Sequence, residues 1–131
     1  MIKTFILNPF QVNTYIVSDK NKNSIIIDPA CYGKEEEKLI SDYIDTNSLS
    51  IKHIVLTHAH IDHILGADFI QNRYKPELIA HKESELFTNQ ASDYGMNFGF
   101  TNVVPPRITK YINDGDIIQC GEMSFQVLYT P

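Results

Sequence analysis

Histidine and aspartate side chains, both common metal ligands, gather in one short segment of the chain. The segment Thr57-His58-Ala59-His60-Ile61-Asp62-His63 holds three histidines and one carboxylate. In an extended chain, residues two positions apart project to the same side, whereas in a helix they do not. If the segment is extended, His58 and His60 therefore converge on one ion. Asp62 and His63 are then expected to turn away from that pair towards a second ion. The pattern predicts a metal centre.

The mixture of imidazole and carboxylate favours Zn²⁺, with Fe and Mn as alternatives. Two such ions, about 3.5–4 Å apart, hold a bridging hydroxide and polarise a carbonyl group. That chemistry hydrolyses esters, thioesters and amides at neutral pH. The competing interpretations are a surface loop that happens to be rich in histidine, or a zinc contact between crystal copies. The density of ligands directly after a buried strand favours the metal centre.

The elements that position this segment alternate between strands and helices, which predicts an α/β fold with a mixed sheet. The segment follows a strand, at the edge of a sheet where α/β folds place their ligand chemistry. We expect an apolar face on the first helix, formed by Leu39, Ile40, Tyr43 and Ile44. The expected strands are 4–7, 12–17, 24–27, 51–56 and 78–80, followed by a terminal hairpin of 116–120 and 123–129. One helix is expected to begin near 34, a second to run over 64–72 and a third to pass through 83 and 86. The segment 92–107 is expected to be irregular.

Size and composition narrow the class of protein. The 131 residues, 43% of them apolar and 21% charged, suit one globular domain. The net charge of −5 argues against a nucleic-acid partner, which requires clustered Lys and Arg. No apolar run is long enough for a signal peptide or a membrane span, so we expect a cytoplasmic protein without a membrane partner. Cys31 and Cys120 are expected to be free thiols.

Several segments together resemble a known family. Thr57 to His63, followed by Gly66, resembles the metal-binding motif of the metallo-β-lactamase superfamily. Four further segments resemble the glyoxalase II-like branch, whose members are hydroxyacylglutathione hydrolases and related thioesterases. These segments are Asn13-Thr14-Tyr15, Ile25-Ile26-Ile27-Asp28-Pro29, Ala80-His81-Lys82-Glu83 and Asn113-Asp114-Gly115-Asp116.

The resemblance implies the N-terminal half of an αββα sandwich that binds up to two zinc ions. His58 and His60 would bind the first ion. Asp62 and His63 would bind the second. Asp62 would also be catalytic, because it orients the metal-bound hydroxide that attacks a small thioester or ester. Asp28, at the end of its strand, would brace the histidine loop by hydrogen bonds.

In the family, the remaining metal ligands follow a strand that Phe125 to Pro131 resembles. We therefore expect residues 1–131 to form an incomplete metallo-β-lactamase-like domain, inactive alone and homo-oligomeric through its uncovered sheet. The spare histidines His53 and His81 are expected to be structural, and Cys31 a small buried side chain. Two other functions remain open, a non-catalytic metal-binding or oligomerising fragment and a mono-iron sulfur dioxygenase. Substrate-binding residues are not predicted.

Overall fold

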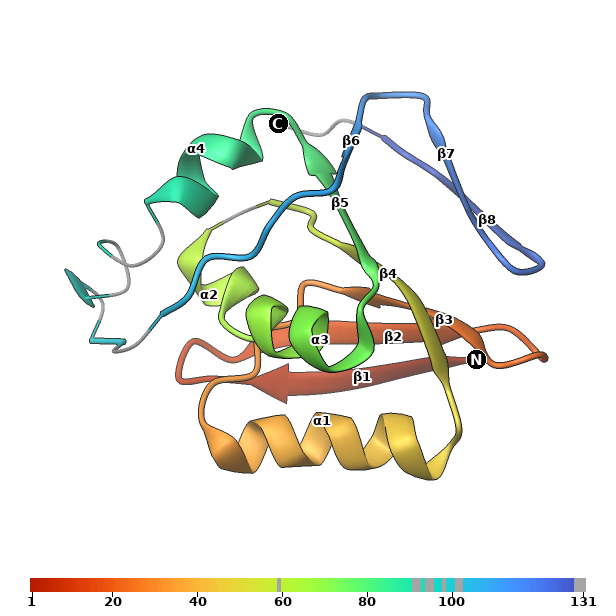
Figure 1. The fold of residues 1–131 in the computed structure, drawn as a ribbon, viewed down its shortest axis with the longest axis horizontal. Coiled ribbons are helices and arrows are strands. Elements are labelled where there is room, and N and C mark those ends of the chain that lie inside the picture. The colour runs from red at the N-terminus through yellow and green to blue at the C-terminus, as the bar shows by residue number, and fades with distance from the viewer. Residues whose placement is uncertain (59, 91–92, 94–95, 98, 101–102, 129–131) are drawn as a thin grey trace.

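A computed structural model describes residues 1–58, 60–90, 93, 96–97, 99–100 and 103–128 of the chain (Figure 1). Tyr129, the last residue of the final expected strand, and parts of the expected irregular segment lie outside them. The strands are β1 (Ile2–Leu7), β2 (Val12–Ser18), β3 (Asn23–Ile27), β4 (Ser50–Val55), β5 (Glu77–His81), β6 (Lys110–Ile112), β7 (Ile117–Cys120) and β8 (Met123–Gln126). The helices are α1 (Lys34–Thr46), α2 (Ile61–Ile64), α3 (Ala67–Tyr74) and α4 (Ser84–Asn89).

The main sheet has six strands in the order β1-β2-β3-β4-β5-β6. The first three strands pair antiparallel, and β3 to β6 pair parallel. The sheet is therefore mixed, as the sequence predicts. β6 is not among the expected strands, because it has three residues and only Ile112 is buried. Its order comes from pairing with β5, which a local sequence pattern does not reveal.

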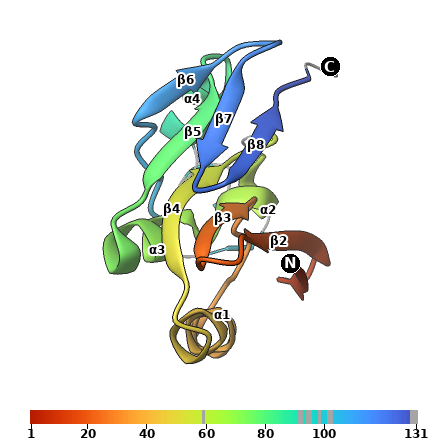
Figure 2. The same ribbon diagram turned by 90° about the vertical axis from the view of Figure 1, so that its right-hand side faces the viewer.

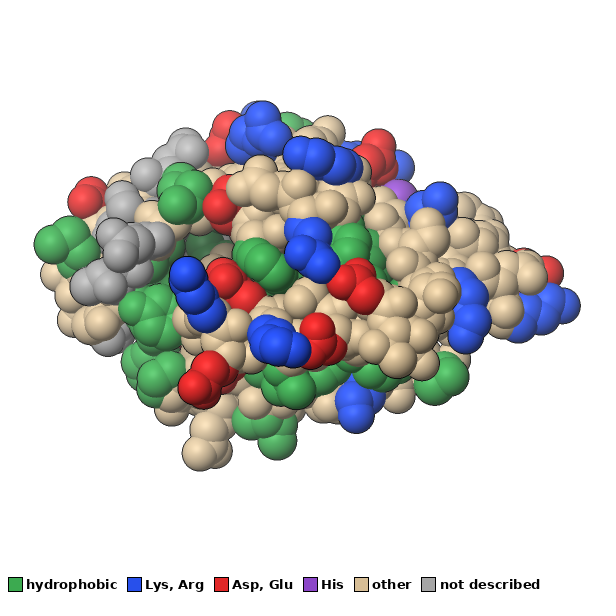
Figure 3. Space-filling model, turned by 60° about the horizontal axis from the view of Figure 1, so that its bottom comes forward, with side chains coloured by type: hydrophobic (Ala, Val, Ile, Leu, Met, Phe, Trp, Pro, Cys, Tyr) green, Lys and Arg blue, Asp and Glu red, His purple; other side chains and the backbone are tan. Residues whose placement is uncertain are grey.

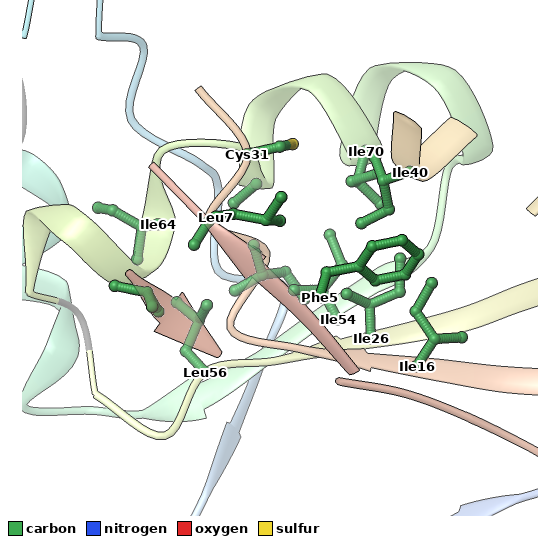
Figure 4. Packing of buried hydrophobic residues seen from close by; sticks show 14 of the residues in the cluster. Phe5, Leu7, Ile16, Ile26, Cys31, Ile40, Ile54, Leu56, Ile64 and Ile70 are labelled. Atoms are coloured by element: carbon green, nitrogen blue, oxygen red, sulfur yellow. The ribbon is translucent and has the colours of Figure 1, made fainter. Parts of the chain in front are cut away.

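Helices α1 and α3 pack on one face of the sheet, where the main core lies (Figure 4). Ile26 and Ile54 from the central strands meet Ile40 of α1 and Ile70 of α3 in this core. α1 buries Ile40, Ser41 and Ile44. Leu39 was expected on the buried face of α1 but is 53% exposed, so that prediction is wrong. At 100° per residue, Leu39 points away from the stripe that Ile40 and Ile44 form.

The expected helix over 64–72 is two helices, because tertiary contacts break it at Gly66. In a continuous helix the Gly66 amide donates to the Asp62 carbonyl. Here it donates to Pro29 O at 2.9 Å instead. A Cβ built on Gly66 would lie 2.1 Å from Cys31 Sγ, so glycine is required for this close approach. Leu65 and Phe69 are partly buried against the main core.

The hairpin of β7 and β8 forms a separate two-stranded sheet. Figures 1 and 2 show it at the end of the molecule away from α1. Its residues Ile118, Phe125 and Val127 form a second, smaller apolar cluster with Ile79 and Ile112 of the main sheet. The hairpin is also tied by polar bonds, since His53 Nε2 lies 3.1 Å from Gln119 O and the Glu122 amide donates to Asp19 Oδ2 at 3.0 Å.

The face that carries α1 is covered by mixed charges. Figure 3 shows Lys and Arg side chains interspersed with Asp and Glu over it. Lys38 and Asp42 of α1 form an ion pair, as do Arg73 of α3 and Asp45 of α1. Among the described helices, none combines the length and the apolar character needed to span a bilayer.

Candidate metal centre

Three imidazole rings converge where β4 ends. The ring centres of His58 and His60 are 4.6 Å apart, and those of His58 and His63 are 3.9 Å apart. His60 is in an extended conformation directly before α2, with φ −61° and ψ 144°, and α2 then carries Asp62 and His63. The expectation that His63 turns away from His58 is wrong. The first turn of α2 folds its ring back beside that of His58.

The buried carboxylate of Asp28 holds the histidine segment in place by hydrogen bonds. Its Oδ1 accepts a hydrogen bond from the Thr57 amide at 2.8 Å. Its Oδ2 accepts one from the Thr57 hydroxyl, and lies 3.0 Å from His63 Nδ1. Asp28 adopts a left-handed backbone conformation, φ 52°, and its carbonyl accepts from Thr14 Oγ1 at 2.6 Å. These contacts fix the backbone at the end of β3, from which the Asp28 carboxylate extends to the histidine segment.

These bonds also select which nitrogen of each ring faces outwards. His63 Nδ1 donates to Asp28, which leaves Nε2 for a ligand. The Thr57 hydroxyl gives its proton to Asp28, so it accepts from His58 Nδ1 at 3.0 Å. His58 Nε2 takes no part in the bond to the Thr57 hydroxyl. A carboxylate that fixes the histidine tautomer from behind is the usual arrangement around bound metals.

The electrostatics of the two neighbouring rings differ. The hydrogen bond to Asp28 raises the pKa of His63, against the opposing effect of its burial. Burial, and then the charge of His63, lower the pKa of His58. His58 is therefore the more readily neutral of the two, and neutral imidazole is the form that binds metal.

Imidazole and carboxylate groups are ligands that suit a transition metal. Among the described residues, Asp28, His58 and His63 place such atoms within 4.8 Å of one another, and that group does not include His60 and Asp62. Asp62 Oδ2 is 3.6 Å from His63 Nε2, which is too long for a hydrogen bond but close enough for both atoms to share an ion. His60 is exposed beside them.

A cleft of about 640 Å³ runs from the histidines between the main sheet and the hairpin. His58 and His60 stand in its lining together with Thr57. Its walls are largely apolar, and include Ile25, Ile27, Val55, Ile118, Phe125 and Val127. Such a combination of apolar walls and a few polar groups is typical of small-molecule sites.

The spare histidines lie outside the cluster of three rings. His53 sits between Gln119 O and Glu77, with Nδ1 3.5 Å from Glu77 Oε2. His81 lines the cleft, and its Nδ1 accepts a hydrogen bond from the Glu83 amide at 3.1 Å. Cys31 and Cys120 are buried free thiols, as expected. Burial raises the pKa of Cys31 to about 12, which makes it a poor nucleophile.

Two polar side chains of the site were missed from the sequence. Thr57 links His58 to Asp28, and its position directly before the first histidine was the available signal. Asn8 lies at the turn after β1, and its Nδ2 donates to Asp62 O at 2.8 Å. Asn8-Pro9 indicates only a turn in the sequence.

Comparison with known proteins decides the family. Residues 7–131 match the metallo-beta-lactamase superfamily model. The chain belongs to the metallo-β-lactamase superfamily. This agrees with the α/β architecture, which matches the N-terminal part of that fold.

The curated relatives include hydroxyacylglutathione hydrolases. The chain is 30% identical to hydroxyacylglutathione hydrolase GloC of Haemophilus influenzae, over 93% of this chain and 57% of that protein. It is also 30% identical to a hydroxyacylglutathione hydrolase of Francisella tularensis subsp. novicida, over 97% of this chain and 41% of that protein. The chain thus spans roughly half the length of these relatives.

Solved structures show the same fold. BLEG-1, a B3 metallo-β-lactamase, superposes with a TM-score of 0.86 at 22% identity, covering 100% of this chain and 62% of that one. TTHA1623 in a di-iron-bound form gives a TM-score of 0.81 at 23% identity, covering 98% and 61%. At these identities the likeness shows the fold alone. One of these structures is described as a di-iron-bound form, and the two curated relatives are named as hydrolases.

Proposed function

We propose that the chain is the metal-binding part of a hydrolase that cleaves small thioesters. The observation that carries the proposal is the convergence of His58, His60 and His63 beside a buried carboxylate that fixes two of the rings. The 30% identity to hydroxyacylglutathione hydrolases supports a thioester in preference to another acyl substrate.

The roles follow the residue positions. His58 and His60 hold a first zinc ion, and Asp62 and His63 hold a second. When bound, the ions acidify water and polarise the substrate carbonyl. Asp62 is the catalytic carboxylate, because its oxygens lie next to His63 Nε2 and can orient the attacking water.

The other residues position the ligands and the substrate. Asp28 keeps His58 and His63 in the tautomers that offer Nε2. The apolar walls of the cleft receive the acyl part of the substrate and exclude water from it. The protein is proposed to act in the cytoplasm on a small molecule, without nucleic acid or membrane.

The test is thioester turnover by the complete gene product. Removal of metal with a chelator should abolish hydrolysis of S-lactoylglutathione, and added Zn²⁺ should restore it. Elemental analysis of the active protein distinguishes zinc from iron and manganese. Iron is included because the similar structure of TTHA1623 is a di-iron-bound form. Absence of thioester turnover in a fully metal-loaded protein would exclude this function. Oxygen consumption with a single bound iron would instead favour the sulfur dioxygenase.

The same chain also presents an apolar face. Ile117 and Leu128 on the hairpin are 53% and 70% exposed, next to the apolar cleft. Exposed apolar side chains of this kind promote association. We propose that residues 1–131 alone form a homo-oligomer through this face, and that they hydrolyse thioesters poorly or not at all.

A further inference from the structure

Asn8 connects the turn after β1 to the segment that carries Asp62 and His63. It is a buried polar residue, and its carboxamide makes three hydrogen bonds. Nδ2 donates to Ala30 O at 3.0 Å and to Asp62 O at 2.8 Å. Oδ1 accepts from the Phe10 amide at 2.8 Å. The donors and the acceptor of one side chain are thus all used.

The bond to Asp62 replaces one that a helix would supply. In a continuous helix the Gly66 amide would donate to the Asp62 carbonyl. Here that amide donates to Pro29 O instead, so the Asp62 carbonyl needs another donor. α2 has four residues, and a helix of that length is not stable by itself. A side chain 54 positions earlier in the chain therefore takes the place of the helical donor.

The backbone of Asn8 is itself held in place. Its amide lies 3.0 Å from both carboxylate oxygens of Glu36, and Glu36 Oε1 also accepts from the Tyr32 amide at 2.8 Å. Asn8 has φ 55°, a left-handed conformation that asparagine and glycine tolerate best. α1 therefore fixes the turn through Glu36, and the turn presents the carboxamide to Asp62.

We propose that Asn8 is a positioning residue, whose carboxamide sets the orientation of the Asp62–His63 turn by holding the Asp62 carbonyl. The role as a support for metal ligands rests on the proposed function, whereas the ordering of α2 does not. By holding the Asp62 carbonyl, the Asn8 side chain keeps Asp62 and His63 of α2 close to His58.

The test compares Asn8→Gly with Gln11→Gly. Both positions lie in the same turn with φ 55°, so glycine suits either backbone, but the Gln11 side chain is exposed. Hydrogen exchange of the metal-free chain then reports on α2 through two amides, those of His63 and Gly66, which donate to His60 O and Pro29 O. Asn8→Gly should speed their exchange roughly tenfold, as expected for the loss of a buried hydrogen bond. Gln11→Gly should leave it unchanged.

A second variant separates the donors from the acceptor. Asn8→Asp keeps Oδ1 and the left-handed preference but places an oxygen against the carbonyls of Ala30 and Asp62. It should speed exchange in α2 at least as much as Asn8→Gly. Unchanged exchange in both variants would overturn the proposal. Exchange that rises equally in β1, β4 and α3 would also overturn it, because that result indicates general destabilisation.

Two further readouts do not depend on turnover, and the first of them needs no variant. In the unchanged protein, the Asn8 side-chain amide protons should exchange several-fold more slowly than those of exposed Asn72, and equal rates would overturn the proposal. If Co²⁺ binds the unchanged chain, Asn8→Gly should alter its visible spectrum and Gln11→Gly should not. If the unchanged chain binds no metal, the proposed function fails, and hydrogen exchange still decides the role of Asn8.

Discussion

At the scale of single residues, His58 and His63 have pKa values that shift in opposite directions although their ring centres lie 3.9 Å apart. The hydrogen bond to Asp28 raises the pKa of His63, whereas burial, and then the charge of His63, lower the pKa of His58. Asp28 orients both rings, that of His58 through the Thr57 hydroxyl, but the two pKa values shift for different reasons.

We expect an NMR titration of the metal-free protein to show His63 losing its proton at higher pH than His58. A raised folded-state pKa means that His63 contributes stability below its ordinary pKa, and that this contribution is lost as pH rises through the raised value. Asp28→Asn removes the charge, so the pKa of His63 should fall. An unchanged His63 pKa in that variant would show that Asp28 does not cause the shift.

Asp62 is expected to matter for turnover far more than for folding. In the complete gene product, Asp62→Ala should lower kcat by about 10²-fold or more, because the variant loses both a ligand and an orienting group. The free energy of unfolding of the metal-free protein should change by less than about 1 kcal/mol, since the side chain is only partly buried. Near-normal kcat would exclude the catalytic role.

The sequence located the cluster of histidines because they and Asp62 are close together along the chain. It did not identify the position of the His63 ring, because the turn of α2 depends on contacts with other segments. Thr57 and Asn8 were missed for the same reason. Their partners lie 29 and 54 positions away, and such pairings leave no local pattern.

At the scale of elements, the break between α2 and α3 depends on Gly66. Gly66→Ala would place its Cβ 2.1 Å from Cys31 Sγ and 2.9 Å from the Cys31 backbone nitrogen. We expect this variant to lose about 1–3 kcal/mol of unfolding free energy, as overpacked cores do. Denaturant unfolding measures the loss.

The double variant with Cys31→Ala tests the cause of that loss. It should recover part of the free energy relative to Gly66→Ala, because the sulfur is the nearest atom. Cys31→Ala alone is the control for the cavity that the substitution opens. Wild-type stability in Gly66→Ala would show that the two segments do not pack as closely as described.

Most strands and the start of α1 were predicted within a residue or two, since their apolar residues follow a clear alternation or helical spacing. The helix expected over 64–72 is α3 for most of its length, but α3 begins at Ala67, because the apolar pattern continues across Gly66 while the helical hydrogen bonds do not. β6 was missed because its sequence follows Pro105-Pro106 and it pairs only briefly with β5.

At the scale of the whole molecule, the sheet has a helical layer on one face and a short hairpin over part of the other (Figure 2). We expect residues 1–131 to form dimers or larger species in light scattering. Leu128→Lys should shift the population towards monomer, whereas Leu39→Lys, at a similarly exposed position on α1, should not. A monomer at high protein concentration would contradict association through this face.

The mixed α/β sheet was evident from the order of the elements, and the family from one metal-binding motif. The arrangement of the hairpin was not evident, because it is determined by tertiary bonds such as His53 with Gln119 O. The cleft next to the histidines exists only through that arrangement.

The metal content of the purified chain tests the central claim most directly. Elemental analysis should find zinc or another transition metal in the unchanged protein, and this metal should be lost when His58 and His60 are both replaced by alanine. His81→Ala, which alters another histidine in the lining of the same cleft, should retain it. A folded double variant that binds as much metal as the unchanged protein would contradict the assignment of this cluster as the metal centre.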